Sequence, residues 1–295
     1  MKAFPWLGIV IAFGLAAGAL TVAAQRPGQP PFQGAPRGFA QRGFDLPADR
    51  AGVPDWQVDP HFKKDVFTFA RIQYSSYGGG FGRRGGGGRW ATDWPDADLN
   101  FSYRLQQLTS LRVNPEPIIL RLTDPKLFDY PFIYIVEPGA LVFADDEVLA
   151  LRKYLLNGGF LMVDDFWGDY EWDNFYREIK RVFPDKEPTE LPLEHEIFHC
   201  VYNLREKPQI PSINAAWYGK DRGITYEMGH GGNTEQVHYR GLHDDKGRLM
   251  ALICHNTDNG DGWEREGEDP WYFKEFSEKK AYPLGINIIV YVMTH

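Results

Sequence analysis

Residues 132–165 have the sequence FIYIVEPGALVFADDEVLALRKYLLNGGFLMVDD, and this stretch decides the fold class. Its first five residues, 132–136, are all apolar, which is typical of a central parallel strand buried on both faces. Asp145 opens a predicted helix through Leu156, and Gly158 stands where a left-handed turn ends a helix. Residues 160–163 are apolar again and end in two aspartates. The stretch therefore predicts a strand, a helix and a second parallel strand.

The same alternation extends to both sides of this unit. The β-branched and aromatic run 66–74 predicts an earlier strand. A helix is predicted over 98–111, where Phe101, Leu105, Leu108 and Leu111 lie at helical spacing. Further on, the patterns predict helices over 173–183 and 285–293 and strands near 210–213, 224–226 and 249–254. We expect an α/β fold in which a mostly parallel sheet is covered by helices on both faces.

The N-terminus has the pattern of a bacterial-type signal peptide over residues 1–24. Lys2 is its positive residue, Leu7–Leu20 is apolar, and Val22-Ala23-Ala24 supplies the small residues that precede cleavage before Gln25. Without cleavage, the same apolar run would serve as a membrane anchor. Residues 25–64 are rich in Pro and Gly and predict a disordered spacer. We therefore expect a periplasmic or secreted protein with a single folded domain over 65–295.

Charge and cysteine content limit the classes of partner. The chain carries a formal net charge of −8, so nothing in its overall charge favours nucleic acid. Membrane contact is expected only if the signal segment is retained. Cys200 and Cys254 both follow apolar stretches and are expected to be buried free thiols rather than a disulfide.

Polar residues follow the predicted strands at the edge of the sheet where α/β proteins place their sites. Asp164 and Asp165 end the strand that begins at Phe160 and are candidate catalytic residues. Adjacent strand residues point to opposite faces, so one carboxylate could face a cleft while the other bonds to nearby backbone N–H groups. Asp in this position is also common for structural reasons alone.

Three further segments carry residues with ligand chemistry. His195 and His199 fit the H-E-x-x-H expression of zinc proteases, but Pro192 before them predicts a loop, and no third ligand is evident. Segment 255–264 is rich in oxygen ligands suited to a hard cation, although its spacing is not that of an EF-hand. A tight polar turn that binds no metal is the alternative. The metal candidates there are Asp258, Asp261 and Glu264. The Gly/Arg-rich segment 78–89 could bind phosphate but lacks the end of a P-loop, and a mobile surface insertion is the alternative.

Taken together, several stretches identify the chain as a member of the domain-of-unknown-function 4159 (DUF4159) family. The resemblance covers about Asp65 to His295 and rests on residues 69–74, 93–98, 127–132, 151–160, 164–165, 182–184, 195–198 and 285–291. That family is similar in fold to class I glutamine amidotransferase-like proteins, including the trehalose-utilisation type. The resemblance implies a flavodoxin-like three-layer sandwich.

The same resemblance argues against glutaminase chemistry. In active amidotransferases the corresponding strand ends in a cysteine on a sharp elbow, whereas here 160–163 is followed by Asp164-Asp165. The favoured function is a non-catalytic envelope module that binds an envelope protein, a small molecule or a glycan through an aromatic groove. Its aromatic candidates are Trp90, Trp94, Trp167 and Trp172.

The alternative function is an envelope hydrolase acting on a glycan or a related substrate, with or without a metal. Its catalytic candidates are Asp93, Asp164, Asp165 and His195. The sequence requires no cofactor but allows a divalent metal. The hydrolase predicts that several of these groups converge with perturbed pKa values, and the binding module predicts an aromatic-lined groove without such convergence.

Overall fold

The computed structural model describes residues 46–62, 65–77 and 88–295. The predicted signal peptide, most of the predicted spacer and residues 78–87 of the Gly/Arg-rich segment lie outside the described residues. Every described residue belongs to one unit, which runs from Gly34 to His295. Within the described ranges, no helix is long and apolar enough to cross a membrane.

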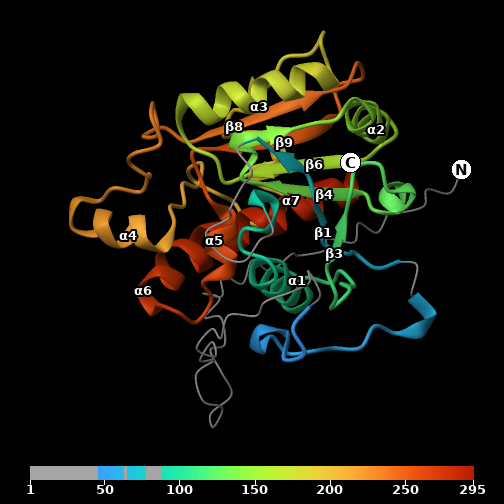
Figure 1. The fold of residues 1–295 in the computed structure, drawn as a ribbon. Coiled ribbons are helices and arrows are strands. Elements are labelled where there is room, and N and C mark those ends of the chain that lie inside the picture. The colour runs from blue at the N-terminus through green and yellow to red at the C-terminus, as the bar shows by residue number, and fades with distance from the viewer. Residues whose placement is uncertain (1–45, 63–64, 78–87) are drawn as a thin grey trace, which may run out of the picture. The chain divides into compact units, whose positions relative to one another are not determined.

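Seven strands of the described chain form one mostly parallel sheet (Figure 1). In spatial order they are β3 (Ile118–Leu120), β1 (Ala70–Ile72), β4 (Phe132–Val136), β6 (Phe160–Asp164), β9 (Leu249–His255), β8 (His238–His243) and β7 (Thr189–Glu190). The first five are parallel, and β8 pairs antiparallel with both β9 and β7. Two short strands, β2 (Ser75–Ser76) and β5 (Leu141–Val142), pair separately.

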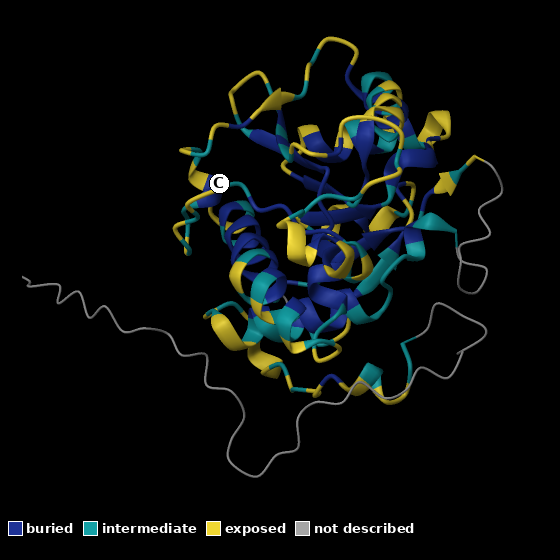
Figure 2. Ribbon diagram, turned by 90° about the vertical axis from the view of Figure 1, so that its left-hand side faces the viewer, coloured by how far each residue is buried: buried dark blue, intermediate teal, exposed yellow. Residues whose placement is uncertain are grey.

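Helices cover both faces of this sheet. The helices are α1 (Asp96–Leu108), α2 (Asp145–Leu156), α3 (Gly168–Val182), α4 (Ile213–Gly219), α5 (Asn259–Glu264), α6 (Pro270–Tyr272) and α7 (Tyr282–Thr294), with a π-helical segment over Phe273–Ala281. Apolar residues of α2 and α3 pack against one face in one core cluster, and those of α1, α5 and α7 pack against the other face in a second cluster. Figure 2 shows buried strands between helices whose outer surfaces are exposed.

The central strands are buried because successive side chains point alternately into the two hydrophobic cores, one on each face of the sheet. Phe132 and Tyr134 of β4 enter the α1 and α7 core, while Ile133 and Ile135 enter the α2 and α3 core. All five residues of β4 are buried. The predicted α/β alternation over 132–165 is therefore confirmed by β4, α2 and β6.

Other element predictions differ in detail. The predicted helices over 98–111, 173–183 and 285–293 correspond to α1, α3 and α7, with α3 beginning five residues early, at Gly168. The strand predicted near 210–213 is wrong, because the prolines at 208 and 211 have no N–H to pair and α4 begins at Ile213. The strand predicted near 224–226 is also wrong, since this segment is a loop that follows the 3-10 turn Lys220–Arg222. Strand β8 was not expected, because its sequence HYRGLH mixes polar residues into the pattern.

Candidate functional site

The carboxyl ends of three adjacent parallel strands share an unusual backbone feature. Glu137 follows β4, Asp165 follows β6 and Asn256 follows β9, and all three have a positive φ, at 46°, 56° and 61°. Non-glycine residues rarely adopt this left-handed conformation, and where they do the strain is concentrated at functional sites. The bridge between Phe166 and Thr257 joins the extensions of β6 and β9 here. This edge of the sheet is therefore where a site is expected.

Asp164, the last residue of β6, is completely buried and serves as an anchor. Its Oδ1 accepts a hydrogen bond from Asn259 Nδ2 at 2.7 Å, and its Oδ2 accepts from the Tyr134 hydroxyl at 3.0 Å and Gly260 N at 3.1 Å. Burial raises the pKa of Asp164 to about 6, although these hydrogen bonds oppose the rise. Asp164 thus fixes the first residues of α5 against the sheet.

The oxygen-rich segment predicted as a turn is a short helix. Asp258 is its N-cap and accepts a hydrogen bond from Asp261 N at 2.7 Å, so the helix α5 begins at Asn259. The three predicted metal candidates, Asp258, Asp261 and Glu264, are buried and project from this helix and its cap. They therefore lie beside the strand ends, where Asp164 holds α5.

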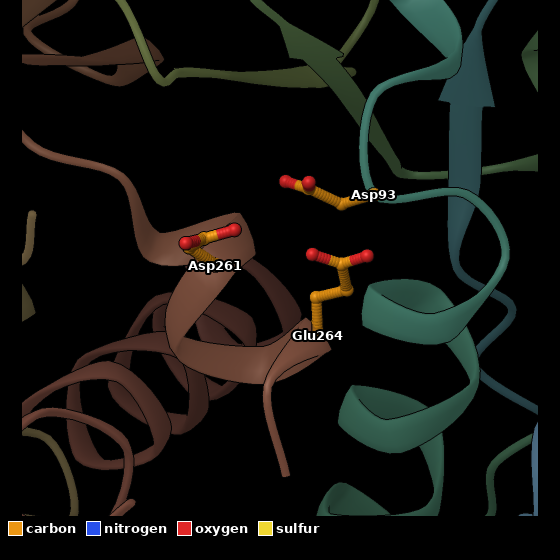
Figure 3. A group of neighbouring side chains, drawn as sticks. All are labelled: Asp93, Asp261 and Glu264. Carbon is orange, nitrogen blue, oxygen red and sulfur yellow. The ribbon is translucent and has the colours of Figure 1, made fainter. Parts of the chain in front are cut away.

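Asp93 reaches the same place from the turn before α1. It also has a positive φ, of 61°. Arg71 of β1 holds this turn: its guanidinium, completely buried, donates to the carbonyls of Trp90 at 3.0 Å and Thr92 at 2.7 Å and pairs with Asp98. Figure 3 shows Asp93 extending toward Asp261, with Glu264 alongside. The Oδ2 atom of Asp93 is buried and accepts no hydrogen bond from a described residue.

Two groups of carboxylates bring their oxygens close enough to share a cation. Asp93, Asp261 and Glu264 form one group, and Asp93, Asp165 and Asp258 form the other; within each, one oxygen from every residue lies within 4.8 Å of the others. Asp93 belongs to both groups. An all-oxygen donor set favours hard cations such as Mg²⁺, Ca²⁺ or Mn²⁺ over zinc.

The charges of this cluster repel one another. Burial and then the charges of Glu264 and Asp261 raise the pKa of Asp93 well above its usual range. Burial followed by Glu137 and Asp93 does the same to the pKa of Asp165, and burial followed by Asp165 and Asp261 to that of Asp258. Such a cluster is costly without a counter-charge, which a proton or a cation would supply.

Basic groups neutralise only part of the cluster. Arg265 pairs with Asp261 at 3.2 Å and with Glu264 at 2.7 Å. Among the described residues, none makes an ion pair with the carboxylates of Asp93, Asp165 or Asp258. Within the described ranges, the second group therefore has no basic neighbour in direct contact.

Sequence reasoning missed a set of groups at the rim of the cluster. Burial raises the pKa of Glu137 to about 7, although Arg89, 3.9 Å away, opposes the rise. Arg89 also pairs with Glu171 at 3.3 Å. Glu227 accepts from His230 at 3.0 Å and raises the pKa of that imidazole. The only signal for Glu137 was its place directly after an apolar strand.

Other predicted residues lie elsewhere. His195 caps a 3-10 turn over Glu196–Phe198, and its ring lies tilted against that of Tyr291. The α-helical arrangement that a zinc-protease motif needs is therefore absent from this segment. His199 bonds instead to Asn203 and to the carbonyl of Leu193. Both cysteines are free thiols, as predicted, but Cys200 is only half-buried, since it lies on a turn.

The aromatic candidates for a binding groove are largely enclosed. Trp90 and Trp167 are 4 % and 1 % exposed, respectively, so both pack into the protein. Trp94 and Trp172 are half-buried, and Trp172 lies under the guanidinium of Arg240 at 4.0 Å. These four side chains offer no continuous open aromatic surface.

The fold and the site define an α/β protein with a buried carboxylate cluster at the carboxyl edge of a mostly parallel sheet. A family model described as a domain of unknown function (DUF4159) matches residues 68–293, and the chain belongs to that family. None of the curated proteins matches the chain. The function is therefore argued from the site itself.

Proposed function

We propose that this protein is a hydrolase of the cell envelope that depends on a divalent cation held by Asp93, Asp165 and Asp258. The observation that carries the proposal is the convergence of these three carboxylates from a turn, a strand end and a helix cap, within 4.8 Å. None of the three makes an ion pair with a described residue, and Asp93 Oδ2 is buried without a hydrogen bond from the described part of the chain. The donors fit a hard cation.

A bound divalent cation would supply a water of lowered pKa and polarise the substrate. The proton transfers of the reaction would be carried out by a residue of the chain. Attack of this water on the electrophilic atom of the substrate would break the bond to the leaving group, and Glu137 would pass the proton that it takes from the water on to that group. Glu137 takes the proton of the water, because it stands beside Asp165 at the end of the neighbouring strand: Val136 is in register with Asp164. A pKa of about 7 suits that role near neutral pH.

Convergence favours the hydrolase over the non-catalytic module. A binding module would require an open aromatic groove, whereas Trp90 and Trp167 are buried. A hydrolase requires titratable groups with perturbed pKa values near each other, and Asp93, Asp165 and Asp258 meet that requirement. We propose an envelope glycan or a related substrate, on the basis of the signal-peptide pattern in the first 24 residues.

A relationship to the glutamine amidotransferase-like fold, with its flavodoxin-like sandwich, is part of the same proposal. Asp165 stands directly after β6 with a positive φ, which is the position and backbone conformation of a nucleophile elbow. The thiol of Cys254 lies inside β9, and burial raises its pKa well above the usual range. Because thiolates rather than thiols attack, the proposal excludes Cys254 as a nucleophile.

The test is a thermal melt of residues 25–295, first with a chelator and then with Mg²⁺, Ca²⁺, Mn²⁺ or Zn²⁺. A ligand that binds only the folded state stabilises it by roughly 2.7 kcal/mol at a hundredfold excess over Kd. We expect a higher midpoint with a hard cation and no such rise in Asp165→Asn. Asp129→Asn, an exposed aspartate far from the cluster in sequence, is the matched control and should behave as the wild type.

Activity is then measured on p-nitrophenyl glycosides, acetate and phosphate with the cation that raised the midpoint. Cation-dependent release of p-nitrophenol that is lost in Asp165→Asn supports the hydrolase. No shift in midpoint with any of the four cations would overturn the proposal.

A further inference from the structure

The carboxylate of Asp93 is common to both groups of possible metal ligands, which raises the question of whether one cation binds or two. Asp165 and Asp258 form one group with this shared residue, and Asp261 and Glu264 form the other. We infer that Asp93 bridges two divalent cations, one held with Asp165 and Asp258 and the other with Asp261 and Glu264. This inference rests on the proposed function and states how many cations that site holds.

The geometry of the two groups suits a shared carboxylate. Oxygen ligands at 2.0–2.6 Å from a hard cation lie at most about 5 Å from one another, and each group meets that limit, at 4.8 Å. The two oxygens of one carboxylate can each bind a different ion, and catalytic pairs of metals are about 3.5–4 Å apart. Two ions that share only Asp93 therefore fit the arrangement of the donors.

The surroundings of Asp93 also favour a bound cation. Its Oδ2 is buried and accepts no hydrogen bond from the described part of the chain, while Figure 3 shows the carboxylate directed into the cluster. A buried charged acceptor without a partner is costly, and a cation bound to this oxygen would remove that cost. Gly260 leaves the necessary room: a methyl group there would lie 2.5 Å from Asp93 Oδ2 and 3.3 Å from Asp258 Oδ1.

The two positions should differ in affinity, because among the described residues one position has a basic partner and the other has none. Arg265 already pairs with both Asp261 and Glu264, at 3.2 Å and 2.7 Å. A cation entering that group competes with the guanidinium, whereas Asp165 and Asp258 make no ion pair with a described residue. The ion at Asp165 and Asp258 therefore binds first, and the ion at Asp261 and Glu264 binds second and more weakly.

A pair of cations also narrows the chemistry of the proposed reaction. Two adjacent metals hold the attacking and the leaving oxygen at the same time, an arrangement used for displacement at phosphate and carbonyl centres. On the proposed envelope glycan or related substrate, the bond that fits is thus an ester or phosphoester with an oxygen leaving group, rather than a glycosidic bond cleaved by two carboxylates alone.

The experiment is a calorimetric titration of MnCl₂ into metal-free protein of residues 25–295, followed by electron paramagnetic resonance at one and two equivalents. We expect two binding steps, with Kd values at least about tenfold apart. At two equivalents the spectrum should show exchange coupling, since a shared carboxylate joins the two ions. Asp165→Asn should lose the tight step, Glu264→Gln the weak step, and Asp93→Asn should weaken both; Asp129→Asn should keep both.

The outcomes separate this inference from the function on which it rests. One step only, lost in both Asp93→Asn and Asp165→Asn, overturns the bridged pair and leaves a single-cation hydrolase. Two steps with uncoupled spectra, or steps that persist in Asp93→Asn, also overturn the pair. No binding at all overturns both proposals. Because Asp261 also accepts a hydrogen bond from Ile213 N at 2.8 Å, Glu264→Gln is preferred to a change at Asp261, and circular dichroism checks that each variant is folded.

Discussion

Gly260→Ala is the smallest change that should disturb the cluster without removing a carboxylate. The added methyl carbon would lie 2.5 Å from Asp93 Oδ2, where ordinary van der Waals contact begins at 3.4 Å. The oxygen must therefore move by about 0.9 Å, the difference between these distances. Metal–ligand distances tolerate only about 0.2 Å of change. We expect the affinity for Mn²⁺ to fall by about tenfold or more.

The stability of the metal-free protein should respond differently. Gly260 lies in α5 without a positive φ, so alanine is compatible with its backbone and is favoured there by up to about 1 kcal/mol. Asp93 Oδ2 is the end of a side chain and accepts no hydrogen bond from described residues, so it can turn aside at low cost. Affinity should thus fall while the free energy of unfolding without metal changes by less than about 1 kcal/mol.

Calorimetric titration with MnCl₂ and urea denaturation in a chelator measure the two quantities. A double-mutant cycle supplies the control: if the methyl group acts through Asp93, then Gly260→Ala should have little further effect on affinity in an Asp93→Asn background. Wild-type affinity in Gly260→Ala would refute the placement of a cation against Asp93, and equal losses in both backgrounds would refute the mechanism.

Three further changes test separate parts of the account. Arg71→Lys keeps the charge but loses the planar guanidinium that bonds to Asp98 and to the carbonyls of Trp90 and Thr92. Urea denaturation should therefore show a free energy of unfolding lower by about 3 kcal/mol, and titration should show a weaker affinity for Mn²⁺. An unchanged affinity would contradict the role of Arg71 in positioning the turn that carries Asp93. Glu137→Gln should gain stability relative to the wild type as pH rises from about 5 to 8. The pKa of Glu137 is raised to about 7 in the folded state, so its ionisation lowers the free energy of unfolding of the wild type over this range. A difference in unfolding free energy that does not change with pH would count against this. His195→Ala should leave Mn²⁺ binding unchanged and cost about 1 kcal/mol in a thermal melt, since His195 only caps a turn through a bond from Ile197 N; lost binding would restore it to the site.

Parts of the sheet could be predicted where the hydrophobic pattern of one segment alone was enough to identify a strand or helix. The apolar run of β4, the apolar run of β6 that precedes Asp164, and the capped helix α2 between them are local patterns, and neighbouring elements do not change them. Strand β8 lies between β9 and the short edge strand β7 and carries Arg240 and three other polar or small residues. Its place in the sheet therefore depends on pairing with the apolar strand β9, which follows it in sequence. Such strands are set by tertiary contacts that the sequence does not display.

The candidate site could be predicted only in parts. Asp164 and Asp165 follow a recognisable strand, and the oxygen-rich residues of 258–264 suggested a hard cation, but nothing in the sequence joined these two segments. Hydrogen bonds from Asn259 and Gly260 to Asp164 join them, across 95 and 96 positions. Helix α5 itself was missed because two of its six residues are glycine and its start depends on those distant bonds.

The positive φ angles of Asp93, Glu137 and Asp165 were also beyond sequence analysis. Aspartate and glutamate give little local sign of a left-handed backbone, which here is imposed by the surrounding contacts. The sequence also grouped His195 with the carboxylates because of its H-E-x-x-H spacing. That spacing is meaningful only on an α-helix, whereas this segment forms a 3-10 turn.

Crystals of residues 25–295 grown with MnCl₂, with anomalous diffraction collected at the manganese absorption edge, would test the central claim most directly. If Asp93 bridges two cations, anomalous peaks should lie within about 2.6 Å of its carboxylate oxygens, the stronger beside Asp165 and Asp258 and the weaker beside Asp261 and Glu264. An ordered cluster without an anomalous peak, in crystals that hold Mn²⁺ elsewhere, would contradict it.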